Sequence, residues 1–225
     1  MATAGGWRSV SEGLGIVVGL EAEARVVQGL GAEVEIGGGD AEGAAAATSR
    51  LVARGVRSLL SFGLAGGLDP SLAPGTLLVP DVVLSRDGHW PTHPPLSAEL
   101  GRVGGAVFSG GAIVASAAAK RALFERTGAA AVDLESAAVA EEAARHAIPF
   151  AVLRAVCDPA GRSLPQAALL ALDGQGRIGP WRVVRAALAH PRELPSLIAL
   201  AADAARARRA LMRRVVAITR ARDQA

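Results

Sequence analysis

Short apolar runs alternate with amphipathic or alanine-rich stretches along residues 14–156. The first run, residues 14–20 (LGIVVGL), lies between Gly13 and a charged stretch, which is typical of a strand that is buried on both faces and leads into a helix. Strands separated by helices pair mainly in parallel, so the pattern predicts an α/β domain with helices on both faces of the sheet. The same alternation predicts further strands at 56–64, 76–84, 103–108, 130–134 and 149–156, and helices at 41–54, 116–127 and 135–146.

Proline and glycine interrupt this pattern at several places. Pro80 lies inside the predicted strand at 76–84 and indicates an edge position or a bulge there. Residues 86–95 are rich in Pro and His and predict a loop, and residues 63–67 (GLAGG) predict a turn that closes the preceding strand. Residues 173–180 form the one linker-like break.

Beyond Pro165 the pattern is helical, and residues 194–222 predict one long final helix. Its apolar side chains recur at helical spacing, and four arginines lie opposite them: the apolar residues are Leu197, Leu200, Ala204, Ala207, Leu211, Val215 and Ile218, and the arginines are Arg206, Arg209, Arg213 and Arg220. Either the helix docks on the domain with a solvated basic face, or it rests on anionic lipid. We expect one domain, residues 1–225, with a helical C-terminal extension at about 180–225.

Composition narrows the class of protein. A chain of 225 residues that is 51% hydrophobic and 20% charged fits one globular domain. Cys157 is the only cysteine, which excludes an internal disulfide and fits the reducing cytoplasm. Every apolar stretch is broken before 18 residues, and residues 1–13 contain Arg8 and Glu12, so we expect neither a spanning helix nor a signal peptide.

The net charge does not indicate a nucleic-acid-binding protein. The sequence pI is about 10.3, but the formal net charge is only +3, and the pI is high because almost no side chain titrates between neutral pH and the arginine range. Aromatic residues make up 3% of the chain, too few for the stacking that such proteins commonly use. We therefore expect no nucleic-acid partner.

Three acidic residues follow predicted strands, namely Glu23, Glu135 and Asp158. Ligands of α/β sheets bind beyond the carboxyl ends of the strands, which makes these residues the first candidates for a site. Glycine-rich stretches at 37–39 and 63–67 would let backbone amides approach a ligand closely. Taken singly these signals are weak, because Glu135 is also an ordinary first residue of a helix and Glu23 an ordinary surface residue.

The joint pattern resembles a known family. The stretches GLEAEA (19–24), SFGLAGGLDP (61–70), AVDLESAAVA (131–140) and PFAVLRAVCDPAG (149–161) are similar in order and spacing to the purine nucleoside phosphorylase and methylthioadenosine nucleosidase superfamily. Residues 61–70, 157–159 and 164–165 and the Arg-rich tail most resemble its hopanoid-associated branch. The resemblance implies a three-layer α/β/α sandwich around a central mixed, mostly parallel sheet, and removal of adenine from adenosylhopane in hopanoid biosynthesis.

The resemblance also implies a role for each acidic residue. Asp158 matches the acid that protonates, or hydrogen-bonds to, N7 of the purine, which makes the base a neutral leaving group. Glu135 matches the carboxylate that holds the ribose hydroxyls, and Glu23 the residue that activates water in the nucleosidases. The other substrate-binding positions that it implies are Leu134, Ile113, Val114, Leu64, Ala65 and Gly66, and the candidate anion site consists of Gly38, Gly39, Arg25 and Arg86.

Three departures from the family bear on the choice of nucleophile. Leu64 replaces a serine, Ile113-Val114 replace an adenine-stacking phenylalanine, and Asp40 replaces a glycine beside the candidate anion site. Two carboxylates, those of Glu23 and Asp40, would repel phosphate. We therefore expect hydrolysis with Glu23 as general base, and phosphorolysis with phosphate as co-substrate is the alternative.

The resemblance implies no metal or organic cofactor. His89 and His93 are spaced like helical metal ligands, but three prolines among residues 91–95 exclude that helix. Cys157 is expected to be a buried structural thiol rather than a nucleophile. The expected protein is a cytoplasmic homodimer, peripheral to the inner membrane if the final helix contacts lipid. The alternative functions are a methylthioadenosine or S-adenosylhomocysteine nucleosidase, a purine nucleoside phosphorylase, and a non-catalytic nucleoside-binding protein.

Overall fold

The computed structural model describes residues 13–101, 104–171 and 190–224, without the side chains of residues 170 and 171. Its strands are β1 (Leu14–Val18), β2 (Glu33–Ile36), β3 (Ser58–Gly67), β4 (Leu77–Leu78), β5 (Val82–Leu84), β6 (His89–Pro91), β7 (Ala106–Ser109), β8 (Ala131–Asp133) and β9 (Phe150–Asp158). Its helices are α2 (Glu21–Val27), η1 (Gln28–Leu30), α3 (Ala41–Ala53), α4 (Pro94–Glu99), α5 (Ala117–Thr127), α6 (Ser136–Arg145), α7 (Gln166–Ala171), η2 (Pro191–Glu193) and α9 (Leu194–Asp223).

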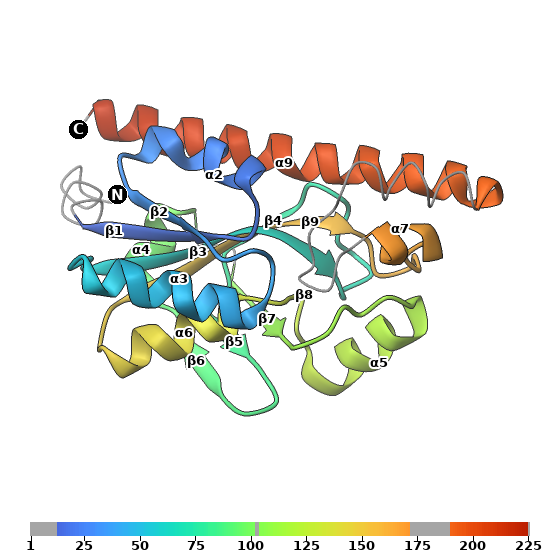
Figure 1. Ribbon diagram of the computed structural model, residues 1–225, viewed down its shortest axis with the longest axis horizontal. Helices are drawn as coiled ribbons and strands as arrows, with labels where there is room; N and C mark the ends of the chain where they lie inside the picture. Colours follow the sequence, from blue (N-terminus) through green and yellow to red (C-terminus); the bar gives the residue numbers. More distant parts are fainter. Residues whose placement is uncertain (1–12, 102–103, 172–189, 225) are drawn as a thin grey trace.

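The strands form one mixed sheet in the order β2-β1-β3-β8-β7-β5-β6, and β9 pairs with β3 and β4. Five of the eight strand pairs are parallel; β3–β8, β4–β9 and β5–β6 are antiparallel. Helices α2 and α9 cover one face of the sheet, and α3 and α6 cover the other (Figure 1). The predicted three-layer α/β/α sandwich with a mixed, mostly parallel sheet is confirmed.

Strand β1 shows why the apolar pattern folds this way. All five of its residues are buried, and successive side chains enter different cores. Leu14, Ile16 and Val18 pack in the cluster that includes α9, whereas Val17 packs in the cluster of α3 and α6. A strand with an apolar layer on each face needs apolar residues at every position, which is the run seen in the sequence.

Three local predictions were wrong. The strand predicted at 76–84 is split into β4 and β5, because Pro80 lacks the N–H that a continuous ladder needs. The loop predicted at 86–95 contains β6, which pairs antiparallel with β5, and the start of α4. The turn predicted at 63–67 is instead the second half of β3, which continues to Gly67 beside β9. The predicted break at 173–180 lies outside the described residues.

Helix α9 confirms the predicted final helix to within one residue at its C-terminal end. Ala207, Leu211, Val215 and Ile218 are buried and belong to the same core cluster as β1. In Figure 1 the helix runs along the outside of the molecule beside α2. Among the described helices, none is long and apolar enough to cross a membrane.

Candidate functional site

One pocket gathers most of the residues that the sequence predicts as a site. Its volume is about 330 Å³, and it opens where β1, β3, β8 and β9 end or lead into the next element. It is lined by the three predicted carboxylates and by seven further predicted residues: Glu23, Glu135, Asp158, Gly39, Leu64, Ala65, Gly66, Ile113, Val114 and Leu134. Leu200 and Ala204 of α9 complete the apolar wall, so the final helix contributes directly to the pocket.

Glu23 is buried rather than solvated, with 4% of its surface exposed. It is the third residue of α2, and its Oε2 accepts hydrogen bonds from the amides of Gly19 and Leu20, each at 3.0 Å. Its Oε1 accepts one hydrogen bond, also at 3.0 Å, from the amide of Leu64, and therefore keeps a free lone pair. Burial raises the pKa of Glu23, although Arg154 and the three amides oppose this rise.

Glu135 lies between β8 and α6 and is 5% exposed. Its Oε2 accepts a hydrogen bond from Nη2 of Arg154 at 3.1 Å, while its Oε1 is buried without a hydrogen-bond partner. A side chain at Gly19 would place a Cβ 2.6 Å from this oxygen and would have to displace the carboxylate. Burial raises the pKa of Glu135 to about 7, with Arg154 opposing the rise and Glu23 and Asp133 adding to it.

Arg154 is shared among several acidic groups. It lies inside β9 with 1% of its surface exposed, and its Nε is 2.7 Å from Oδ2 of Asp133 in ion-pair rather than hydrogen-bond geometry. Burial acts to lower the pKa of Arg154, but Asp133, Glu135 and Glu23 raise it above its ordinary value. Three carboxylates therefore surround one guanidinium, and this side of the pocket has an excess of negative charge.

Asp158, the last residue of β9, has a cation of its own. Its Oδ2 accepts a hydrogen bond from Nζ of Lys120, a fully buried residue of α5, and its Oδ1 is buried without a partner. The same ammonium donates to the carbonyls of Pro159 at 3.1 Å and Arg162 at 2.8 Å, which uses all three of its donors. Burial raises the pKa of Asp158, while Lys120 lowers it.

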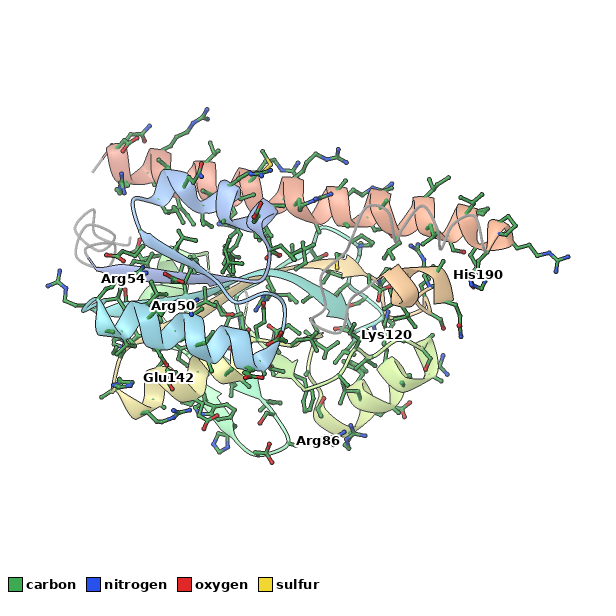
Figure 2. The ribbon with its side chains drawn as sticks, in the orientation of Figure 1. Arg50, Arg54, Arg86, Lys120, Glu142 and His190 are labelled. Atoms are coloured by element: carbon green, nitrogen blue, oxygen red, sulfur yellow. The ribbon has the colours of Figure 1, made fainter. Side chains whose placement is uncertain are left out.

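The predicted anion site is not assembled. Arg25 is exposed and pairs with Glu21 at 3.5 Å, and Arg86 lies in the turn between β5 and β6, at the edge of the molecule away from α9 (Figure 2). Of the four predicted residues only Gly39 lines the pocket, and Gly38 does not. Asp40 acts as the N-cap of α3, where its Oδ1 accepts a hydrogen bond from the amide of Gly43 at 2.7 Å.

Arg154, Asp133 and Lys120 belong to the site but were missed by the sequence analysis. Arg154 could have been identified from the sequence, because an arginine in the middle of a buried apolar strand needs acidic partners close to it. Lys120, the only lysine in the sequence, gave no such indication. It lies in a helix whose sequence is otherwise typical of a surface helix, and the hydrogen-bond partners of its side chain are at least 38 residues away in the chain.

Cys157 was expected to be a buried structural thiol, but it is partly exposed and lines the pocket. Burial raises the pKa of its thiol to about 12, so the protonated thiol predominates at neutral pH and is a poor nucleophile. Within the described residues, no three His, Cys, Asp or Glu side chains are grouped so that they could hold a metal ion.

Comparisons with known proteins agree with this architecture. The family model described as "Phosphorylase superfamily" matches residues 17–103 and 96–175. No curated protein sequence matches the chain.

Solved structures of two Helicobacter pylori enzymes superpose on the chain with a TM-score of 0.61 at 22% identity. The 5'-methylthioadenosine/S-adenosyl homocysteine nucleosidase match covers 65% of this chain and 85% of the enzyme, and the futalosine hydrolase match covers 65% and 84%. A 5'-methylthioadenosine/S-adenosylhomocysteine nucleosidase of Colwellia psychrerythraea, solved with adenine, has a TM-score of 0.58 at 24% identity and coverage of 65% and 82%. At these identities the likeness shows a common fold.

The family match extends over well more than half of the chain and includes the end of β1, all of β3, β8 and β9, and the three pocket carboxylates. The chain therefore belongs to the phosphorylase superfamily, whose enzymes cleave N-glycosidic bonds.

Proposed function

We propose that this protein releases adenine from a 5'-substituted adenosine by hydrolysis, with adenosylhopane as its preferred substrate. The observation that carries the proposal is a pair of buried carboxylate oxygens, Oε1 of Glu135 and Oδ1 of Asp158, that have no protein partner and belong to residues lining one pocket. An unpaired buried acceptor is costly, so each oxygen is suited to a ligand hydroxyl or N–H.

At the purine, Oδ1 of Asp158 would hold the proton that N7 takes up as the glycosidic bond breaks. Protonation lets the base leave as a neutral molecule and leaves positive charge on the ribose. Lys120 would act as a positioning residue, since it binds only Oδ2 and leaves Oδ1 for the base. Ile113 and Val114 provide aliphatic faces for the ring.

At the ribose, Oε1 of Glu135 would accept hydrogen bonds from the hydroxyls, and Glu23 would take a proton from the attacking water. The backbone amides hold the Glu23 carboxylate in place and leave one lone pair on Oε1 for that water. The raised pKa of Glu23 makes it a stronger base than an exposed glutamate. The negative charge of Glu23, Asp133 and Glu135 also favours the positive ribose of the transition state.

The same charge argues for water rather than phosphate as the nucleophile. Arg154 is the only arginine among the described residues that line the pocket, and it is already bound to Asp133 and Glu135. A phosphate dianion would have to enter beside three carboxylates without a free cation, at a cost of several kcal/mol in a partly desolvated site. Neither Arg25 nor Arg86 lines the pocket, and Arg25 is already paired with Glu21 at the surface.

The preference for a lipid substituent rests on the apolar lining and on the sequence resemblance. Leu20, Leu64, Leu164, Leu200 and Ala204 supply aliphatic surface on the pocket wall. Leu164 and the Arg-rich α9 are also among the features that resemble the hopanoid-associated branch. A methylthioadenosine or S-adenosylhomocysteine nucleosidase is the second candidate, because the small methylthio group of methylthioadenosine also suits an aliphatic wall. We also propose a cytoplasmic homodimer in peripheral contact with the membrane.

The test is an assay of adenine release from adenosylhopane, methylthioadenosine and adenosine, with and without phosphate. We expect free ribosyl product, no dependence on phosphate, and the highest kcat/KM for adenosylhopane. A higher kcat/KM for methylthioadenosine would select the second candidate. Strict dependence on phosphate with a 1-phosphorylated ribosyl product would contradict hydrolysis and leave Asp158 and Glu135 in their proposed roles.

A further inference from the structure

Helix α9 carries a second apolar row that faces outward. Of the six large hydrophobic side chains that are exposed in the described structure, four lie on this helix: Leu194 (42%), Ile198 (68%), Met212 (51%) and Val216 (47%). They are separated by 4, 14 and 4 residues, each close to a whole number of helical turns, and so lie on one line about 33 Å long. Ala201 and Ala205 fall on the same line between them.

This exposed apolar row is distinct from the buried face of α9. The buried face consists of Ala207, Leu211, Val215 and Ile218, which pack in the core cluster. The buried face alone explains how α9 packs on the domain. The exposed apolar row therefore needs a separate explanation.

Arginines flank the exposed row on both sides. Arg208 lies along one side, and Arg209, Arg213 and Arg220 along the other; all four are exposed, and no ion pair links them to the described parts of the chain. Helix α9 contains seven arginines and two aspartates, a net charge of +5. The whole chain carries +3, so the remainder carries a net charge of −2. The positive charge of the protein is therefore concentrated on this helix.

We propose that this face of α9 is a membrane-binding surface in which the exposed row enters the headgroup region of an anionic bilayer and the flanking arginines contact lipid phosphates. A helix that lies in the interface combines these two features, an apolar line and a cationic border. A nucleic acid would use the arginines but leave the apolar row in water. The apolar row and the arginines together therefore select the lipid surface.

A second copy of the chain fits this face less well. Symmetric pairing would bring like-charged arginine rows together, which is unfavourable. Four side chains also present far less than the surface of about 800 Å² per partner that a stable dimer buries.

The surface adjoins the pocket. Leu200 and Ala204 line the pocket, and Ile198 and Ala201 of the same turns face outward. On the proposed function, a substrate with its 5' substituent in the bilayer would thus reach the pocket along α9. The surface itself is tested without reference to any substrate.

The experiment is co-sedimentation of the full-length protein with phosphatidylcholine vesicles that contain or lack phosphatidylglycerol. We expect binding only to the vesicles with phosphatidylglycerol, weakened by salt. The double variant Ile198→Glu/Val216→Glu should lose binding at least about tenfold, because two side chains that enter the apolar region become charged. Arg209→Ala/Arg213→Ala should weaken binding and its dependence on salt.

The matched control is Ile36→Glu, which replaces an isoleucine that is 41% exposed on β2, a strand at the edge of the sheet, rather than on α9. It should bind like the wild type. All variants should release adenine from methylthioadenosine at the wild-type rate, so loss of activity and loss of binding can be told apart. Equal binding by wild type and Ile198→Glu/Val216→Glu, or no binding of the wild type, would overturn the proposal. So would a wild-type dimer that this double variant dissociates in sedimentation velocity.

Discussion

Glu135 and Asp158 lie in the same pocket with one oxygen each left unpartnered, yet they are held by different cations in different ways. Arg154 serves Glu135 and Asp133 and lies near Glu23, so one guanidinium is shared among three carboxyl groups. Lys120 serves Asp158 alone, and its two remaining donors bind carbonyls. The first group is anionic, whereas the second is a neutral pair.

This difference assigns a chemical task to each group. In the anionic group, burial raises the pKa values of Glu23 and Glu135, and for Glu135 the neighbouring carboxylates of Glu23 and Asp133 add to the rise. The group also repels a phosphate nucleophile and attracts a positively charged ribose. The neutral pair fixes the orientation of Asp158, whose pKa is raised by burial while the ammonium of Lys120 opposes the rise. The following predictions change one group at a time, from the largest expected effect to the smallest.

Asp158→Asn removes the proton carrier from the neutral pair and keeps its shape. We expect kcat to fall about 10²-fold or more, because asparagine cannot deliver a proton to N7. Adenine release measures the effect, and thermal unfolding checks the fold. Asp69→Asn is the matched control, since Asp69 caps a turn outside the pocket and should leave kcat unchanged. A near-normal kcat for Asp158→Asn would show that Asp158 is not the acid.

The anionic group should make stability depend on pH. Glu135 has a pKa of about 7 when folded and an ordinary value of 4.5 when unfolded, so between these values the folded state holds a proton that the unfolded state releases. The stabilising contribution of this proton is complete below pH 4.5 and is lost as pH rises through 7, which amounts to about 3 kcal/mol.

Denaturant unfolding from pH 4.5 to 8 measures this loss. Glu135→Gln should remove most of this decline in the free energy of unfolding, because glutamine does not titrate. Glu142→Gln, which changes another buried glutamate of α6 outside the pocket, should keep the decline. An identical slope in wild type and Glu135→Gln would show that the proton is held elsewhere.

Lys120→Met tests whether the cation of the neutral pair acts through Asp158. We expect a loss in kcat of roughly tenfold to thirtyfold, because Asp158 loses the contact that orients it. Lys120 lowers the pKa of Asp158, so its removal should raise that pKa and shift the alkaline fall in activity to higher pH. Arg121→Met, on the exposed side of α5, should change neither quantity. A lower kcat with an unshifted pH profile would show that Lys120 has a structural role only and does not act through Asp158.

The parts of this site that were predictable depend on local sequence. Glu23, Glu135 and Asp158 follow apolar strands whose carboxyl ends meet, and their positions could be read from the order of strands and helices. Lys120 could not, because only the packing of α5 against the loop after β9 brings its ammonium to Asp158. The outward row of α9 also escaped prediction, since helical spacing alone does not say which of two apolar rows meets the core.

Backbone continuity was the hardest feature to predict. Glycine-rich residues 63–67 suggest a turn, but β8 and β9 provide hydrogen-bonding partners on both sides and keep the segment extended as part of β3. Gly63 also leaves room where a side chain would place a Cβ 2.7 Å from Oε1 of Glu23 and 2.5 Å from Nη1 of Arg154. The glycine that looks like a turn signal instead leaves room for these two charged groups, which a side chain there would displace.

Glu135→Gln gives the smallest expected change in activity, because it alters one member of a group that shares its charge. The amide still offers an oxygen to the ribose hydroxyls, but a neutral acceptor binds them less strongly than a carboxylate does. We expect kcat/KM to fall about tenfold, with both binding and turnover affected. The fall should be largest above pH 7, where the wild-type Glu135 is ionised, and should shrink as pH decreases and the wild-type carboxyl becomes protonated. Profiles of kcat/KM against pH for Glu135→Gln and for Glu142→Gln provide the measurement and its control. If kcat/KM for Glu135→Gln equals that of the wild type at every pH, Glu135 only begins α6, and the anionic group acts through Glu23 and Asp133 alone.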